Sequence, residues 1–279
     1  MSFLDLLSYK AKRVVVTGAA SGMGSATIKY LADLDAEIFA LDRNPVDPGP
    51  WKFIQTDLSD KASIDAAVGQ IGGPVHSLFN VAGLAGGRGR ETVTMRVNFF
   101  GHRHLTEQLI PLMPRGGSIV NVTSLAGFRY YLMHDELKPM LDTTTFEEGV
   151  AWLDANEDKF NGYGTSKELM NLWTASNCKR FAEDYGIRLN AVGPGTTDTP
   201  LLDEFKQNAI NRTGTDAGVI ASRGFLGRFA HAEDQAAACV FINSEAAGII
   251  TGQVLYVDGG NAGLMMGGVL PIPGPRLRD

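Results

Sequence analysis

The chain has 279 residues, a formal net charge of −6 and 44% hydrophobic residues. That length accommodates one large domain or two small ones, with a core that needs neither disulfides nor a structural metal. The acidic balance argues against a nucleic-acid or anionic-membrane partner, and no apolar run is long enough to span a bilayer. Two cysteines without metal-ligand spacing, and an N-terminus interrupted by Asp5, predict a cytoplasmic location.

Short apolar runs alternate with helical patterns along the chain. The predicted strands cover residues 12–17, 37–41, 53–55, 75–79, 118–122, 188–192 and 253–257. The predicted helices cover about 22–34, 60–71, 91–113, 163–185 and 232–242. Ser59 or Asp60 caps the second helix, and Gly186 ends the fourth. This alternation predicts an α/β fold, a single doubly wound Rossmann domain with a seven-stranded parallel sheet.

Two segments interrupt the alternation. Residues 128–160 contain a capping box, Thr145 with Glu148, and are therefore expected to form a helical insertion. The insertion is rich in aromatic residues, namely Phe128, Tyr130, Tyr131, Trp152 and Phe160. Residues 261–279 are expected to form a tail in which Pro271, Pro273 and Pro275 break any regular element.

A turn of small residues, Thr17 to Gly24, follows the first predicted strand with the spacing G-x-x-x-G-x-G. Glycines let the backbone approach a pyrophosphate, and the next helix supplies N–H donors at its N-terminus. Asp42 ends the second strand, where a carboxylate accepts hydrogen bonds from an adenosine ribose and repels the additional phosphate of NADP. Either feature alone fits an ordinary turn, but together they predict dinucleotide binding.

From residue 12 to about 260 the sequence resembles the short-chain dehydrogenase/reductase family. The matching motifs are Thr17–Gly24, Asp57, Asn80–Gly83, Asn98 within Val97–Gly101, Ser124 within Asn121–Gly127, Tyr163-x-x-x-Lys167, Pro194-Gly195 with Thr199, and Val257–Gly260. The resemblance implies a cofactor site made of Gly18, Ser21, Gly22, Met23, Gly24, Asp42, Asp57, Leu58, Asn80, Ala82, Gly83, Tyr163, Lys167, Pro194, Gly195, Thr197 and Thr199.

The spacing of the Tyr-x-x-x-Lys pair predicts an interaction between its two side chains. Residues i and i+4 share a helical face, so Lys167 is expected to bring its ammonium near the phenol of Tyr163 and lower its pKa. Tyr163 is then the general acid/base, and Ser124 hydrogen-bonds the substrate oxygen. The resemblance implies that Lys167 also holds the nicotinamide ribose and that Asn98 anchors a water in a proton relay.

NAD is the expected cofactor. Ser21 stands where NADP-preferring family members often carry Arg or Lys, although Arg43 leaves contact with a 2′-phosphate open. No metal site is expected, because His102 and His104 lie two positions apart on a helix and face different directions.

The chain departs from most family members in two places. The segment from Asn80 to Asn98 is short, whereas 39 positions separate Ser124 from Tyr163. A subset that resembles 3α-hydroxysteroid dehydrogenase and coniferyl-alcohol dehydrogenase shares both features. The insertion's aromatic residues form either an apolar wall for a bulky substrate or a self-packed hairpin without substrate contact. Residues 196–229 are expected to form a mobile lid loop.

These observations predict an NAD-dependent dehydrogenase for a secondary alcohol or ketone on a hydrophobic, cyclic substrate such as a steroid, terpenoid or aromatic. An aryl-alcohol dehydrogenase of the coniferyl type and a non-catalytic dinucleotide-binding sensor are the alternatives. The protein is expected to be a homo-oligomer, a dimer or a tetramer, and the insertion borders the long helices through which many family members pair.

Overall fold

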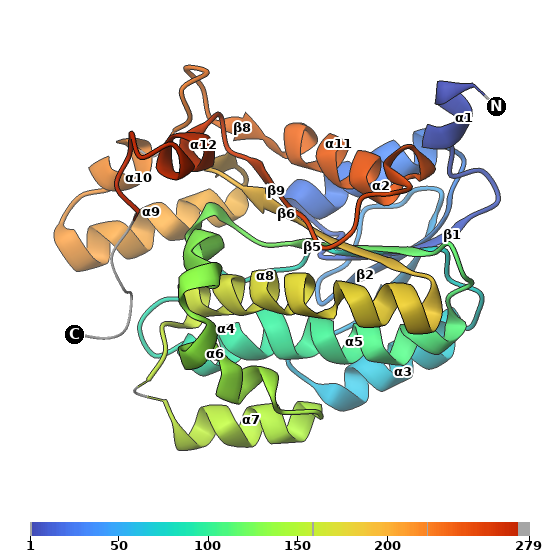
Figure 1. Ribbon diagram of the computed structural model, residues 1–279, viewed down its shortest axis with the longest axis horizontal. Helices are drawn as coiled ribbons and strands as arrows, with labels where there is room; N and C mark the ends of the chain where they lie inside the picture. The colour runs from blue at the N-terminus through green and yellow to red at the C-terminus, as the bar shows by residue number, and fades with distance from the viewer. Residues whose placement is uncertain (1, 158, 222, 273–279) are drawn as a thin grey trace.

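A computed structural model describes residues 2–157, 159–221 and 223–272. Its centre is a parallel seven-stranded sheet in the order β3-β2-β1-β4-β5-β6-β9 (Figure 1). The strands are β1 (Arg13–Thr17), β2 (Glu37–Asp42), β3 (Trp51–Gln55), β4 (Ser77–Asn80), β5 (Ser118–Val122), β6 (Arg188–Pro194) and β9 (Val254–Val257). The predicted strands and the doubly wound α/β fold are confirmed.

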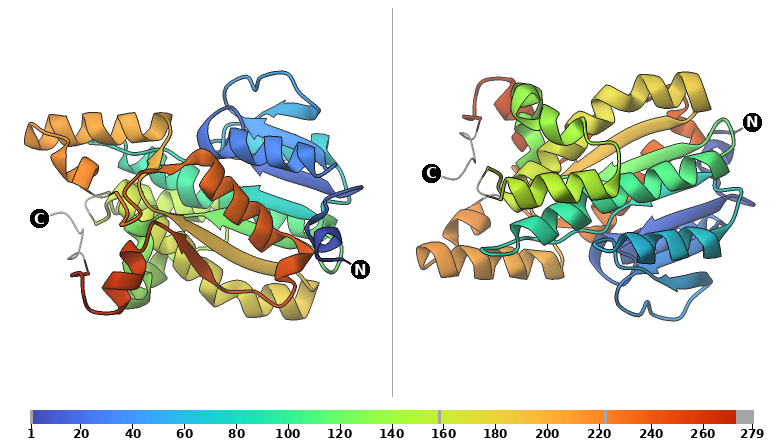
Figure 2. Two further views of the ribbon diagram at one scale, coloured as in Figure 1. Left: turned by 90° about the horizontal axis from the view of Figure 1, so that it is seen from above. Right: turned by 90° about the horizontal axis from the view of Figure 1, so that it is seen from below.

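Helices cover both faces of the sheet (Figure 2). One face carries α2 (Gly22–Asp33) and α11 (Ala232–Asn243), and the other carries α3 (Lys61–Ile71), α5 (His102–Leu109) and α8 (Gly162–Arg180). In β1, Val14 and Val16 pack toward the first pair of helices and Val15 toward the second group. Both faces of β1 are therefore buried, which is why its sequence is a continuous apolar run. No helix in the described segments combines the length and apolarity needed to cross a bilayer.

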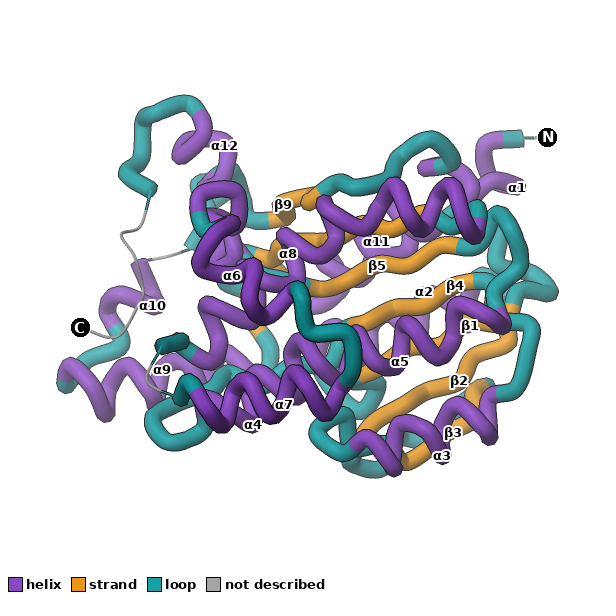
Figure 3. The backbone as a smooth tube through the Cα atoms, turned by 60° about the horizontal axis from the view of Figure 1, so that its bottom comes forward, coloured by secondary structure: helices purple, strands orange, loops and turns teal. Residues whose placement is uncertain are grey.

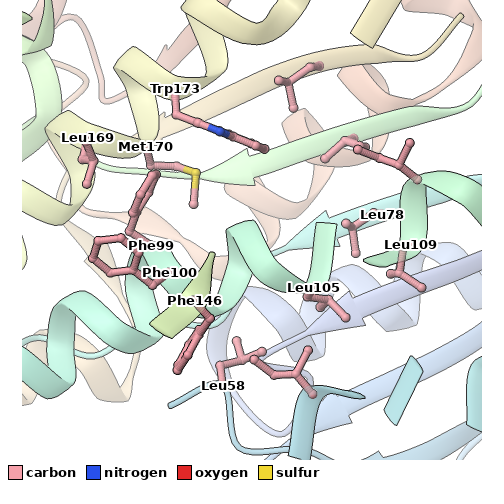
Figure 4. Packing of buried hydrophobic residues seen from close by; sticks show 14 of the residues in the cluster. Leu58, Leu78, Phe99, Phe100, Leu105, Leu109, Phe146, Leu169, Met170 and Trp173 are labelled. Carbon is pink, nitrogen blue, oxygen red and sulfur yellow. The ribbon is translucent and has the colours of Figure 1, made fainter. Parts of the chain in front are cut away.

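The apolar cluster beneath α8 combines aliphatic side chains with several aromatic ones (Figure 4). The rings of Phe99 and Trp173 meet edge to face with their centroids 6.5 Å apart, and Phe99 and Phe100 meet in the same way at 5.0 Å. This packing fixes the buried face of α8, the helix that carries Tyr163 and Lys167.

The predicted helix over 91–113 is divided in the structure. It consists of α4 (Glu91–Met95), a π turn over Arg96–Gly101, α5 and a 3₁₀ turn over Ile110–Leu112. Asn98 lies inside the π turn and hydrogen-bonds both backbone groups of Leu84, and a Cβ on Gly101 would clash with the Leu58 carbonyl. Tertiary contacts therefore stabilise the π turn that interrupts the predicted helix. The predicted end of α8's helical segment is confirmed, because a π turn over Phe181–Tyr185 stops at Gly186 with φ 68°.

The insertion contains a 3₁₀ segment (Leu125–Leu132), α6 (His134–Leu141) and α7 (Phe146–Ala155), and the predicted capping box of Thr145 and Glu148 is present. Both helices lie on the outer side of the molecule, where α6 contacts α8 and α7 contacts the π turn (Figure 3). Buried Arg103 donates hydrogen bonds to the carbonyls of Thr143 and Thr145. Gly149 allows α7 to lie directly on the ring of Phe100.

Two expectations about the C-terminal third were wrong. Residues 196–229 are mainly helical, with α9 (Pro200–Thr213), α10 (Ala217–Ala221) and the first of two short strands, β7 (Thr197–Asp198) and β8 (Ala230–His231). The tail begins with a helix, α12 (Asn261–Met266), because its described proline, Pro271, lies beyond the helix end. Pro273 and Pro275 fall outside the described residues. A short N-terminal helix, α1 (Phe3–Leu7), completes the set of elements.

Candidate active site

The carboxyl ends of β1, β2 and β4 open into a groove of about 240 Å³. It lies where the strand order reverses, between β1 and β4, which is where doubly wound sheets bind ligands. Most of the predicted cofactor residues line it: Gly18, Ser21, Gly22, Met23, Gly24, Asp42, Asp57, Leu58, Ala82, Gly83, Tyr163, Lys167 and Thr199.

The glycine-rich turn leaves no room for side chains. A Cβ on Gly18, whose φ is 72°, would lie 2.6 Å from the Cα of Ala82, and a Cβ on Gly24 would overlap the Gly18 carbonyl. Ser21 is the N-cap of α2 but makes no side-chain hydrogen bond to the first turn. The first-turn amides of α2 therefore have no cap from this residue, which suits a phosphate at the helix N-terminus.

Asp42 is held rigidly at the rim of the same groove. Its carboxylate accepts hydrogen bonds from the backbone N–H of Ala20 at 3.0 Å and of Asn44 at 2.8 Å. Arg43 lines the groove beside it. A fixed carboxylate at this position presents acceptor oxygens to ribose hydroxyls and a negative charge to any additional phosphate.

A buried histidine supports the groove from behind. Thr17 Oγ1 accepts hydrogen bonds from the N–H groups of Val81 (2.9 Å) and Ala82 (3.1 Å), and it lies 3.0 Å from His102 Nε2. The threonine proton is thus directed to Nε2, which makes His102 the neutral Nδ1–H form facing the Asn98 carbonyl at 3.4 Å. Burial, and secondarily the charge of Lys167, lowers the pKa of His102 to about 3.

His104, two residues on, points outward and contacts Asp65 at 2.7 Å. The two histidines therefore face different directions, as the sequence predicts. No group of potential metal ligands is found among the residues that the structure describes.

Lys167 and Tyr163 lie on the predicted shared face of α8. The ammonium of Lys167 is 5.7 Å from the centroid of the Tyr163 ring and donates to the Val122 carbonyl at 2.9 Å. Burial lowers the pKa of Lys167 to about 8, because the low-dielectric surroundings disfavour the charged form. Ser124 Oγ accepts the N–H of Ala126 at 3.0 Å, so its own proton remains available for donation.

A second, larger cavity of about 1250 Å³ adjoins the groove. Tyr163 lines both spaces, and Ser124 lines the larger one. The walls of the cavity come from the loop 85–91, α9, α10 and α12. Phe205 of α9 meets the Tyr163 ring edge to face at 4.8 Å. The side chain of Tyr163 thus stands at the junction between the groove and the larger cavity.

Five predicted site residues lie elsewhere. Pro194, Gly195 and Thr197 line the larger cavity rather than the groove. Asn80 lines neither space, because its buried amide donates to Thr106 and Asn121 and joins β4 to β5. Asn98 also lies behind the site.

The side chain of Asn98 is occupied by protein partners. Its Oδ1 accepts the N–H of Leu84 at 2.8 Å, and its Nδ2 donates to the Leu84 carbonyl and to Ser166 Oγ. The amide therefore holds the loop after β4 against α8.

The aromatic residues of the insertion do not form a wall of the substrate cavity. None of the five is a lining residue of either space in the described part of the chain. Phe160 is fully buried beside Trp152, and Phe128 packs against Tyr131 and Tyr256. In the described residues the insertion therefore contributes no aromatic wall to either space, and its helices pack on α8 and on the π turn.

The residues that do form the wall were missed at the sequence level. Leu201, Leu202, Phe205 and Ala209 line the cavity from α9, and Asn261 and Met265 from α12. A signal was present in α9, since Pro200 suits a first helical position and apolar residues recur at helical spacing after it.

Comparison with known proteins agrees with this geometry. Residues 12–134 match the family model described as short chain dehydrogenase, and residues 151–262 match the one described as Enoyl-(Acyl carrier protein) reductase. The coniferyl-alcohol dehydrogenase of Pseudomonas sp. strain HR199 is 34% identical over 254 residues, which cover 90% of this chain and 96% of the relative.

Two solved structures are similar over nearly the whole chain. The 3-alpha-hydroxysteroid dehydrogenase from Pseudomonas sp. B-0831, complexed with NADH, has a TM-score of 0.76 at 26% identity, covering 92% of this chain and 99% of that one. The aldohexose dehydrogenase of Thermoplasma acidophilum has a TM-score of 0.69 at 26% identity, covering 99% of this chain and 100% of that one.

Proposed function

Because the chain belongs to the short-chain dehydrogenase/reductase family and is an oxidoreductase that binds NAD(P), we propose that it interconverts a secondary alcohol and a ketone with NAD(H). The proposed substrate is hydrophobic and cyclic, such as a hydroxysteroid, a terpenoid or an aromatic compound. The observation that carries the proposal is the position of Tyr163, which lines the dinucleotide groove and the larger cavity at once.

Tyr163 is the general acid/base in this proposal. The buried ammonium of Lys167, 5.7 Å from the ring centroid, stabilises the phenolate form of Tyr163 through its positive charge. Lys167 keeps its side chain extended along the groove through its hydrogen bond to Val122, where a nicotinamide ribose would lie. The nicotinamide, when bound, supplies the hydride chemistry.

Ser124 and Asn98 support this proton transfer. Ser124 donates its hydroxyl proton to the substrate oxygen as charge develops there, since Ala126 already uses the serine oxygen as an acceptor. Asn98 fixes the Leu84 backbone at the edge of the groove and Ser166 on α8. Both N–H donors of the Asn98 amide are engaged, so a relay water on this residue would have to donate to one of its oxygens.

NAD is the preferred cofactor in this proposal. Asp42 is fixed by two backbone donors at the position of the adenosine ribose, and a 2′-phosphate there would meet its negative charge. Arg43 is the feature that favours NADP, and Ser21 offers no cation to support it. The NADH complex of the similar 3-alpha-hydroxysteroid dehydrogenase supports the same choice.

A dehydrogenase for aryl alcohols of the coniferyl type is the second candidate. The 34% identical relative carries that activity in its name, and Phe205 beside Tyr163 offers an aromatic contact for a substrate ring. The size of the cavity favours a larger substrate, since about 300–1,000 Å³ is usual for small-molecule sites and this one has about 1250 Å³.

The experiment is an NAD(H)-linked screen of cyclic alcohols, hydroxysteroids and aryl alcohols with the wild type and Tyr163→Phe. The variant should lose turnover by at least about 100-fold while it retains NADH binding, because only the phenolic hydroxyl, the proposed general acid/base, is removed. Turnover by the variant at the wild-type rate would refute the catalytic assignment. Binding of NADH without turnover of any compound would favour the non-catalytic sensor.

A homo-oligomer remains part of the proposal. The insertion helices lie against α8 and the π turn, so they cover part of the long-helix face through which many relatives pair (Figure 3). Subunit contacts of this protein are therefore expected to avoid that face.

A further inference from the structure

Arginine side chains gather around the substrate cavity. Arg88 and Arg90 belong to the loop between β4 and α4, and Arg212 lies in the last turn of α9; all three line the cavity. Glu91 is the single acidic lining residue in the described part of the chain. The cavity therefore carries more positive than negative charge.

Two of these cations are available to a ligand. Arg90 already has a carboxylate neighbour, since its guanidinium lies 3.6 Å from Glu204. Arg88 and Arg212 are exposed and form no ion pair with any residue in the described ranges. An unpaired guanidinium in a ligand cavity suits a carboxylate, sulfate or phosphate, which it binds with charge-assisted, often bidentate hydrogen bonds.

The length of α9 separates Arg212 from the proposed catalytic residue Tyr163. Phe205, Ala209 and Arg212 all line the cavity at positions i, i+4 and i+7, so they share one helical face. Phe205 touches the Tyr163 ring at 4.8 Å between centroids. Arg212 lies seven residues further along α9, which is about 10 Å along the helix axis.

The loop that carries Arg88 is fastened to the same helix. Asn208 of α9 donates a hydrogen bond from Nδ2 to the Gly86 carbonyl at 3.3 Å. Arg88 and Arg212 therefore extend from two connected walls of one cavity. Both side chains are exposed, so a ligand in the cavity can reach them from solvent.

We propose that the substrate carries an anionic group at the end remote from its reacting oxygen and that Arg88 and Arg212 bind this group. The inference rests on the proposed function and adds a negative charge to the hydrophobic substrate. The reacting end lies at Tyr163 and Ser124, the apolar body along Phe205 and Ala209, and the anion at the outer end of α9.

The test compares matched substrates that differ in charge alone. Cyclic ketones that bear a carboxyalkyl chain are assayed beside their methyl esters with NADH, at low and at high salt. The carboxylates should be preferred by about tenfold in kcat/KM, mainly through KM, since the anion binds equally in the ground and transition states. The preference should shrink at high salt.

Variants assign the preference to the two arginines. The double variant Arg88→Gln/Arg212→Gln should reduce the carboxylate-to-ester ratio to near one. The matched control is Arg115→Gln. This exposed arginine precedes β5, at the amino-terminal end of the strand and away from the cavity, so the variant should keep the wild-type ratio. Equal use of ester and carboxylate by the wild type, or a preference that survives in the double variant, overturns the inference while the proposed function stands.

A binding measurement keeps the inference testable if no ketone is reduced, the result that would instead defeat the proposed function. The fluorescent anion 8-anilinonaphthalene-1-sulfonate is titrated into the NADH-loaded protein beside its neutral analogue N-phenyl-1-naphthylamine. The double variant should weaken binding of the sulfonate and leave binding of the neutral analogue unchanged. Equal affinity of wild type and variant for the sulfonate refutes the anion site.

Discussion

His102 makes the folded protein sensitive to acid. It is fully buried between Thr17 and the Asn98 carbonyl, and burial together with the nearby charge of Lys167 lowers its pKa to about 3. In the unfolded chain the same group has its ordinary pKa of about 6.5. Below that value the unfolded chain binds a proton that the folded protein excludes, so acid favours unfolding.

The size of the effect follows from the two pKa values. The stability contributed by neutral His102 is complete above pH 6.5 and is lost as the pH falls toward 3. Between pH 7 and pH 5 the loss amounts to about 2 kcal/mol. For a chain of this length that corresponds to a fall of about 3 °C in Tm.

The assay is thermal unfolding of the wild type and of His102→Gln at pH 8, 7, 6 and 5. Glutamine retains a donor and an acceptor but binds no proton, so the variant lacks this contribution to the pH dependence whatever its stability at pH 8. The difference in Tm between the two proteins should therefore change by about 3 °C between pH 7 and pH 5. Parallel curves for the two proteins would show that His102 does not stay neutral in the folded state.

Three further predictions concern the cofactor, the insertion and assembly. Asp42→Ala should relax the preference for NAD over NADP by about tenfold, measured as the ratio of kcat/KM values; unchanged discrimination would defeat the argument from this carboxylate. Arg103→Met should increase amide hydrogen exchange in residues 134–156 by roughly 100-fold, because the hydrogen bonds to Thr143 and Thr145 are lost. Exchange that stays at the wild-type level would mean that Arg103 does not hold the insertion. Sedimentation of the intact chain and of one lacking residues 130–158 should give different oligomeric states. Identical states would show that the insertion does not control the oligomeric state.

The cofactor half of the site was predictable from sequence because its requirements are local. A pyrophosphate needs small residues where a strand turns into a helix, and Gly18 and Gly24 have no space for a Cβ. The acid at the end of β2 and the pair Tyr163–Lys167 also depend on short spacings along one element. Short contiguous motifs can therefore predict these residues, and most of them line one groove.

The features that the sequence did not predict depend on contacts between segments that are distant in the chain. The π turn at Asn98 follows from hydrogen bonds to Leu84, fourteen residues away, and it leaves no mark in helical periodicity. Asn80 sits in a recognisable motif, yet its amide joins β4 to β5 instead of facing the groove. The sequence leads to the expectation of a loop over 196–229, although α9 has a proline start and an αL glycine, Gly214, at its end.

The insertion and α9 have different positions relative to Tyr163. The insertion packs Phe146 and Gly149 on the buried cluster under α8, so it supports the helix that carries Tyr163. Helix α9 instead places Phe205 on the Tyr163 ring and Arg212 at the far end of the same cavity. We therefore expect substrate choice to depend on the side chains of α9 and on the loop bound to it by Asn208, although the insertion is the longer departure from the family pattern.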